Sequence, residues 1–455
     1  MSRPVVVGGG FAGMAAACRL ADAGHRPIVF ERTPRLGGRA ASFVDRTTNE
    51  TLDDGVHVLM RCCEASLGFL QRIRVSDLLL LQDRLSIPVR FPGGETMLRS
   101  APLPGPLHLF PSLLTYRPLT LRQRLSAGHA ALCLRFARHV NEYCVTSLER
   151  YGQSAAAMER LWNPISVAAL NAPIDAVDAA SMKKVLDRAF LRPDGADMGF
   201  FRVPLATVFD RAKAYTEARG GTVHTGRVVR RLVFDEAGAV TGVETGRGKA
   251  VTASVVILAI PPQDSAHLFP DDRFTPTALT DAAKRLIWSP IANVHLWFDR
   301  PVLRGGFSMA VASPVQGIFD VDWLRGRAPT VAAGSGQHLV LSQSAVSSWS
   351  GLSVGEIVGR MNRALADLLP ETRDAQCVRS LVVTRPRATF VPSPGHNRWR
   401  LGPTIGVDGL LLAGDWTATG WPSTIESAVR SGITAAARAE RLLELLENAE
   451  EGDNG

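Results

Sequence analysis

The sequence is short of cysteine and of long apolar runs, and each shortage excludes a class of protein. Its six cysteines among 455 residues show neither disulfide-framework nor metal-ligand spacing, so we expect reduced thiols, no metal site and a cytoplasmic protein. No stretch of about 18 apolar residues could form a membrane-spanning helix. The chain starts almost directly with the strand-like segment PVVVGGG, so we do not expect a signal peptide.

Acidic residues are missing from one long segment of this basic chain, whose net charge is +8. Bulky apolar residues alternate there with arginines, which suits peripheral contact with an anionic membrane, such as the inner face of the cell membrane. We therefore expect membrane-facing helices at about 105–145; core helices with solvated arginines are the alternative. No nucleic-acid-binding motif is present, so nucleic acid is not an expected partner. Between residues 96 and 141 the six arginines are Arg99, Arg117, Arg122, Arg124, Arg135 and Arg138.

The start of the chain predicts a dinucleotide-binding unit. Segments 5–7 and 27–31 read as strands, and the Ala-rich segment 11–24 between them has helical periodicity. The glycines of the intervening G-x-G-x-x-G motif permit a tight turn, close approach of a pyrophosphate and close helix–strand packing. Glu31, eighteen residues after Gly13, can accept a hydrogen bond from a ribose hydroxyl. The predicted cofactor-binding residues here are Gly8, Gly10, Phe11, Ala12, Gly13, Glu31 and Arg32.

Two later segments resemble further parts of such a domain. Residues 220–262 alternate and turn like a β-meander that ends on an apolar strand, and residues 408–416 form another apolar strand before a loop. We therefore predict an α/β fold in which a second domain interrupts the first. The Rossmann-like cofactor-binding domain comprises 1–75, 208–262 and 396–455, and the inserted α+β substrate-binding domain comprises 76–207 and 263–395.

Motifs near both ends of the chain resemble the flavin-containing amine oxidase and phytoene desaturase superfamily. They are Glu31 with the following GGR at 37–39, DDGVH at 53–57, the strand at Val228, and AGDWTATGWPSTIESAVRSG at 413–432. The resemblance implies FAD in a fold of the glutathione reductase type. No cysteine occupies the loop at 423–425, which implies non-covalent FAD. The cofactor-binding residues that the resemblance adds are Gly38, Arg39, Gly55, His57, Val228, Gly414, Asp415, Pro422, Ser423 and Thr424.

Other blocks over most of the chain resemble one branch of this superfamily, the hydroxysqualene dehydroxylases or squalene-associated FAD-dependent desaturases. Among them are LWNPISVAALNAPIDAVDA at 161–179, FRVPLATVF at 201–209 and SPIANVHLWFDRP at 289–301. The resemblance implies reduction of an allylic C30 alcohol to squalene in hopanoid synthesis, with hydride from reduced FAD. It also implies a polyisoprenoid lipid substrate and other squalene-pathway enzymes as possible partners. The chain departs from the branch at RCCEAS, 61–66.

Such a reaction needs an acid that protonates the leaving hydroxyl. His57 is the candidate, since the family motif places it near the flavin; the alternative is a histidine that only orders its turn. The candidates for the substrate pocket are Asn163, Asn171, Arg387 and Trp421, with capping, ion pairing or core packing as their alternatives. No lysine follows Lys284, which argues against an amine oxidase. A phytoene-type or carotenoid desaturase and a non-catalytic flavin-binding lipid scaffold stay open as functions.

Overall fold

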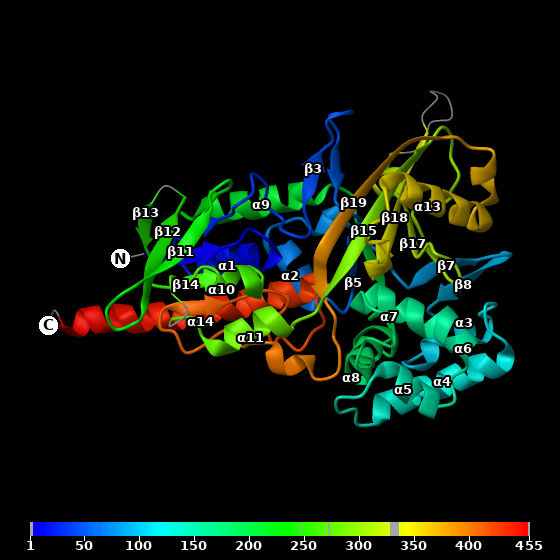
Figure 1. The fold of residues 1–455 in the computed structure, drawn as a ribbon, viewed down its shortest axis with the longest axis horizontal. Coiled ribbons are helices and arrows are strands. Elements are labelled where there is room, and N and C mark those ends of the chain that lie inside the picture. Colours follow the sequence, from blue (N-terminus) through cyan, green and yellow to red (C-terminus); the bar gives the residue numbers. More distant parts are fainter. Residues whose placement is uncertain (1–2, 247, 272–273, 328–335, 454–455) are drawn as a thin grey trace.

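The computed structural model describes residues 3–246, 248–271, 274–327 and 336–453 (Figure 1). Its first unit is a five-stranded parallel sheet in the order β10-β2-β1-β14-β20. These strands are β1 (Val5–Val7), β2 (Ile28–Phe30), β10 (Thr222–His224), β14 (Val256–Leu258) and β20 (Leu410–Leu412). They are short and almost wholly apolar because layers cover both faces of the sheet.

Helices cover one face of this sheet and a second sheet covers the other. The helical layer consists of α1 (Phe11–Asp22), α2 (Glu64–Arg72), α9 (Leu205–Glu217) and α14 (Ile425–Asp453). The opposite layer contains the antiparallel strands β11 (Val229–Phe234), β12 (Val240–Thr245) and β13 (Lys249–Thr252), with α10 (Pro262–Ala266) and α11 (Thr277–Arg285). A Cβ at Gly432 would overlap the carbonyl oxygen of Ala12, so α14 crosses α1 at backbone contact. An N-terminal and a C-terminal segment of the sequence thereby lie side by side.

The second unit is a seven-stranded mixed sheet in the order β19-β15-β18-β17-β16-β7-β8, in which only β16 and β7 run parallel. Its strands are β7 (Ser86–Phe91), β8 (Gly94–Arg99), β15 (Trp288–Phe298), β16 (Phe307–Ala310), β17 (Gly317–Asp320), β18 (Gln337–Ser344) and β19 (Cys377–Phe390). Helix α13 (Val354–Leu368) packs on this sheet, and α12 (Val321–Leu324) follows β17.

A group of helices lies beside β7 and β8, at the lower right of Figure 1. It comprises α3 (Phe110–Leu114), α4 (Leu121–Phe136), α5 (Cys144–Arg150), α6 (Ala155–Ala157), α7 (Asn163–Leu170) and α8 (Ala179–Val185). Two small sheets complete the fold: β3 (Ser42–Val44) with β4 (Thr51–Asp53), and β5 (Val58–Met60) with β9 (Met198–Phe201) and β6 (Leu79–Leu81). The predicted α/β fold class with a Rossmann-like sheet is confirmed.

The domain ranges stay a prediction, with one change that the packing supports. Leu279, Ala282 and Leu286, in and after α11, share a core cluster with Val256 and Leu258 of the parallel sheet. We therefore propose that residues 263–286 belong to the cofactor-binding domain and not to the substrate-binding domain. Among the described residues, no helix combines the length and the apolar character needed to cross a membrane.

Candidate cofactor and active site

A cavity of about 910 Å³ lies against the ends of β1, β2 and β14. The turns that follow these strands line one part of it, because the carboxyl ends of parallel strands meet at one edge of the sheet. Residues of α7, β15 and β19 line another part. The cavity therefore touches both units of the fold, and residues from segments far apart in the sequence meet there.

The first glycine motif forms a cradle for an anionic group. Gly8 has a φ of +109°, and a Cβ at Gly13 would overlap the carbonyl oxygen of Gly8, so both positions require glycine for packing. A Cβ at Gly10 would meet its nearest atom only at 3.8 Å and would occupy the cavity wall. Among the described residues no side chain caps α1, so the N–H groups of its first turn, at Phe11 and Ala12, are available to a diphosphate.

Glu31 lies on the cavity wall at the end of β2. Its carboxylate accepts hydrogen bonds from the Gly9 N–H and from the N–H and hydroxyl of Thr33, each at 2.8 Å. Since a carboxylate can accept about four hydrogen bonds, one acceptor position is left for a ribose hydroxyl. Arg32 lines the same cavity and forms an ion pair of 3.4 Å with Asp264.

Val228 precedes β11 and also lines the cavity. Its carbonyl accepts from the Gly246 N–H at 2.9 Å. The prediction that its backbone holds the adenine therefore concerns the N–H group. Arg227, its neighbour on the cavity wall, donates its N–H to the Glu31 carbonyl at 2.9 Å, which places Val228 at the ribose end of the site.

Arg39 and Asp415 both line the cavity and form an ion pair with each other. The sequence predicts a separate contact with FAD for each of them, whereas the structure joins them through two hydrogen bonds. Arg39 also donates to the Ala388 carbonyl at 2.9 Å, and the Ser423 hydroxyl donates to Asp415. The Arg39 guanidinium is thus partly neutralised and firmly held.

Arg400, which the sequence analysis missed, holds the loop around Asp415. It is buried and donates to the carbonyls of Asp415 and Thr417 at 3.1 and 2.6 Å. Burial lowers its pKa to about 10, so the guanidinium stays charged at neutral pH. A lone arginine before an apolar strand carries no recognisable signal in the sequence.

The C-terminal motif supplies the remaining wall. Gly414 has a φ of +142°, and a Cβ there would lie 2.6 Å from the indole nitrogen of Trp416. Ser423 and Thr424 line the cavity, and the Thr424 hydroxyl accepts from the Ser427 N–H at 3.3 Å as a cap of α14. Pro422 is not among the described residues that line the cavity, although it precedes them directly.

Gly55 and His57 form the turn between β4 and β5. A Cβ at Gly55 would overlap the side-chain amide of Asn293, so glycine is required for this close approach. His57 Nδ1 lies 3.0 Å from the Gly55 carbonyl oxygen, which only accepts; Nδ1 therefore carries a hydrogen and Nε2 is an acceptor. Burial lowers the pKa of His57, opposed by the charge of Asp53. At neutral pH the imidazole is mostly uncharged, so it must gain a proton before it can act as an acid.

The residues predicted for the substrate pocket are only partly brought together. Asn171 lines the cavity, but its amide donates to the Thr389 hydroxyl at 2.8 Å and accepts from the Ala345 N–H at 2.8 Å. Among the described residues that line the cavity, none is Asn163, Arg387 or Trp421. Asn163 accepts from the Ile174 N–H at 3.2 Å, and Arg387 is exposed. The Trp421 ring contacts the guanidinium groups of Arg188 and Arg430.

Other side chains occupy the positions expected for those candidates. Arg385, paired with the buried Asp54, lines the cavity in place of Arg387. Strand alternation does not predict this choice, because the β15–β19 register is irregular between Ser289 and Ile291, opposite the segment of β19 that follows Arg385. Further lining residues that the sequence analysis missed are Ala168, Ala169, Ile291, Asn293 and Thr389.

Comparison with known proteins shows to which family the chain belongs. The family of flavin containing amine oxidoreductases matches residues 11–439. A hydroxysqualene dehydroxylase of Sinorhizobium fredii is 29% identical, over 95% of this chain and 96% of its own. The hydroxysqualene dehydroxylase of Rhodopseudomonas palustris is also 29% identical, over 96% of this chain and 98% of its own. A 15-cis-phytoene desaturase of Synechococcus elongatus is 24% identical, over 97% of both chains.

Solved structures agree with this fold. An oxidoreductase from Methanosarcina mazei has a TM-score of 0.74 at 18% identity, covering 96% of this chain and 100% of its own. Cyclohexylamine oxidase from Brevibacterium oxydans has a TM-score of 0.68 at 17% identity, covering 97% and 99%. The glycine cradle, the uncapped helix and the free acceptor of Glu31 fit FAD. The chain belongs to the family of flavin containing amine oxidoreductases and is an FAD-dependent oxidoreductase.

Proposed function

We propose that this protein reduces hydroxysqualene to squalene, with FAD held non-covalently. The observation that carries the proposal is the whole-chain similarity to two hydroxysqualene dehydroxylases. The cavity supports it, because its wall near α7 and β15 includes Ala168, Ala169, Leu170 and Ile291, which suit a hydrocarbon chain.

The chain's own residues have defined tasks in this reaction. Bound FAD, once reduced, supplies the hydride. The apolar wall holds the isoprenoid chain and excludes water from the reacting carbon. His57 reaches the cavity and, once protonated, can donate from Nε2 to the departing hydroxyl, which leaves as water.

The test uses the reduced holoenzyme, hydroxysqualene and anaerobic conditions, with the lipid product identified by mass spectrometry. Squalene formed in proportion to the flavin oxidised supports the proposal. If folded, fully reduced holoenzyme forms no squalene, the proposal is refuted. Conjugated-polyene absorbance from phytoene with oxidised holoenzyme would instead support a desaturase, the second candidate, favoured by the 24% identity to phytoene desaturase. A flavin whose redox state responds to no substrate would support a lipid scaffold.

We also propose that α4 and the segments beside it contact an anionic membrane. Leu121, Leu125, Leu132 and Phe136 are exposed and form one stripe along α4; Phe136 is 77% exposed. The other large hydrophobic side chains exposed in the same acid-free segment are Leu103, Leu107, Phe110 and Val140. Arg99, Arg117, Arg122 and Arg138 are exposed in the same acid-free segment and complement anionic lipid. The protein would then be peripheral, and interaction with other squalene-pathway enzymes stays a prediction.

Contacts within the protein decide which arginines are suitable for testing this membrane contact. Arg124 donates to the carbonyls of Leu119 and Leu114 at 2.8 and 2.5 Å, and Arg135 lies 3.9 Å from Asp187. These two side chains are engaged within the protein. The exposed Arg117, Arg122 and Arg138 are therefore the appropriate positions for substitution.

A further inference from the structure

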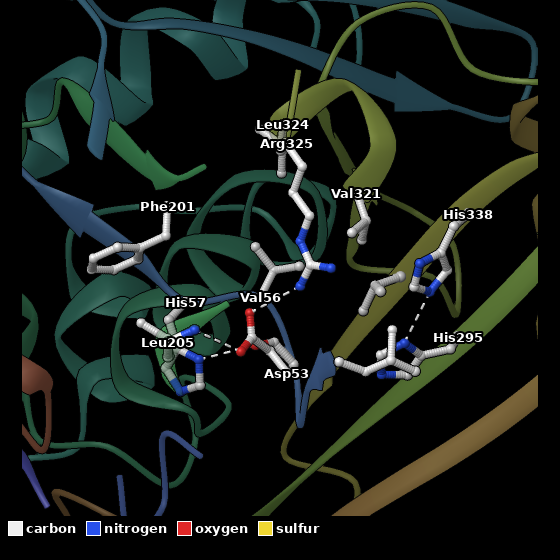
Figure 2. Close-up of a pocket in the computed structure, with 13 residues that line it drawn as sticks. Asp53, Val56, His57, Phe201, Leu205, His295, Val321, Leu324, Arg325 and His338 are labelled. Carbon is white, nitrogen blue, oxygen red and sulfur yellow. Dashed lines mark hydrogen bonds and ion pairs between the residues drawn. The ribbon is translucent and has the colours of Figure 1, made fainter. Parts of the chain in front are cut away.

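A second, small cavity of about 30 Å³ lies beside the turn that carries His57. It is large enough for one or two water molecules. Gly55 and His57 line this cavity and the cofactor cavity alike, so the turn that carries them borders both spaces. Figure 2 shows His57 and Asp53 side by side at one wall, with His295 and His338 at another.

Asp53 is a carboxylate with a fixed position at the small cavity. It accepts from the Ser42 hydroxyl at 2.6 Å and from the Leu205 N–H, in the first turn of α9, at 2.9 Å. Arg325 reaches it from the end of α12, with 3.5 Å between Nη2 and the carboxylate (Figure 2). These contacts hold the carboxylate beside His57.

Arg325 also connects this position with the protein surface. It lies 3.9 Å from Glu50, and Glu50 pairs at 2.5 Å with the half-exposed Arg327. A line of ionisable groups thus leads from solvent at Glu50, past Arg325, to Asp53 and the small cavity. This path is separate from the apolar stripe on α4.

The other ionisable groups around the turn hold no mobile proton at neutral pH. His295 Nδ1 lies 3.0 Å from His338 Nε2; burial lowers the pKa of His295 to about 4 and that of His338 well below its ordinary value, so both rings stay neutral. Asp54 is paired with Arg385. Burial raises the pKa of Asp53 and lowers that of His57, which brings the proton affinities of these two groups toward each other.

We propose that Asp53 is a positioning residue that, through water in the small cavity, supplies the proton that His57 delivers to the departing oxygen. The inference rests on the proposed function. Replacing hydroxyl by hydrogen breaks a C–O bond and forms a C–H bond. It consumes one hydride, which bound reduced FAD supplies, and one proton, which leaves with the hydroxyl as water. The Asp53 side chain is 17% exposed, so solvent replaces that proton at the carboxylate itself.

The test follows His57 directly in the holoenzyme with ¹³C-labelled histidine and NMR titration; His57→Gln identifies the resonance. We expect Asp53→Asn to lower the pKa of His57 by about one unit, because it removes the nearest opposite charge. Asp53→Glu, which keeps the charge, should retain the wild-type value, and so should His338→Gln, which alters the same cavity. An unchanged His57 titration in Asp53→Asn overturns the proposal.

A second measurement titrates the wild-type holoenzyme, so it needs no substitution at Asp53. In the wild-type holoenzyme the Asp53 carboxyl carbon and the His57 ring should change over the same pH range; separate ranges overturn the proposal. In turnover, Asp53→Asn should lower kcat roughly tenfold with little change in KM and full FAD content. A wild-type enzyme that makes no squalene refutes the proposed function, whereas the titrations still decide whether Asp53 controls His57.

Discussion

Replacement of Arg39 by alanine tests how the protein holds the charged part of FAD. Arg39 joins Asp415 through two hydrogen bonds, and the two side chains are 34% and 5% exposed. R39A removes the cation that we expect to face the diphosphate. It also leaves a buried carboxylate there, with the Ser423 hydroxyl as its remaining side-chain donor among the contacts described above.

The expected loss follows from these contacts. A hydrogen bond to a charged group contributes about 1.5–3 kcal/mol, and the partial exposure of Arg39 favours the lower half of that range. A loss of about 2 kcal/mol corresponds to a roughly 30-fold rise in the Kd for FAD. Part of this loss is repulsion by the unpaired Asp415, so the double variant R39A/D415N should bind FAD more tightly than R39A.

The assay is titration of apoprotein with FAD, followed by flavin fluorescence. Arg387→Ala is the matched control, because Arg387 is exposed and lies outside the set of described residues that line the cavity. An unchanged Kd in R39A would contradict the role of Arg39. A double variant that binds FAD more weakly than R39A would show that Asp415 contacts the cofactor itself, as the sequence alone predicts.

Three further predictions concern other parts of the molecule. Changing Arg117, Arg122 and Arg138 together to Gln should weaken binding to phosphatidylglycerol vesicles by about 1 kcal/mol per arginine, and sedimentation that is equal at low and high salt would refute the contact. Asn171→Ala should lower the free energy of unfolding by about 3 kcal/mol through lost hydrogen bonds and a φ of 50°, whereas Asn171→Gly tolerates that φ and should lose less; equal urea midpoints would contradict this. Hydrogen bonds from Thr48 and Arg379 lower the pKa of Asp45 to about 2, so its contribution to stability is present above pH 4 and is lost as the pH falls from 4 to 2. Asp45→Asn should therefore lower the thermal midpoint much more at pH 6 than at pH 2, and an equal deficit at both would refute the assignment.

Local patterns were sufficient to predict the first cofactor-binding strands and a dinucleotide, and the resemblance to a known family identified the dinucleotide as FAD. Gly8 and Gly13 lie within one turn, where Gly8 has a φ of +109° and a Cβ at Gly13 would overlap the Gly8 carbonyl oxygen. The C-terminal motif was recognisable for the same reason, since Gly414 and the start of α14 are neighbours in sequence. The position of α11 on the parallel sheet could not be read in this way, because it depends on a core shared with distant strands.

By itself the sequence predicted a dinucleotide-binding cradle followed by an acid suited to a ribose, because short-range backbone geometry favours glycine in such a turn. Only the tertiary structure decided that Arg39 pairs with Asp415, that Arg385 and not Arg387 reaches the cavity, and that Asp53 lies beside a cavity shared with His57. These contacts join segments up to several hundred residues apart. Their geometry depends on how α14 crosses α1 and on an irregular register between β15 and β19, which no local pattern encodes.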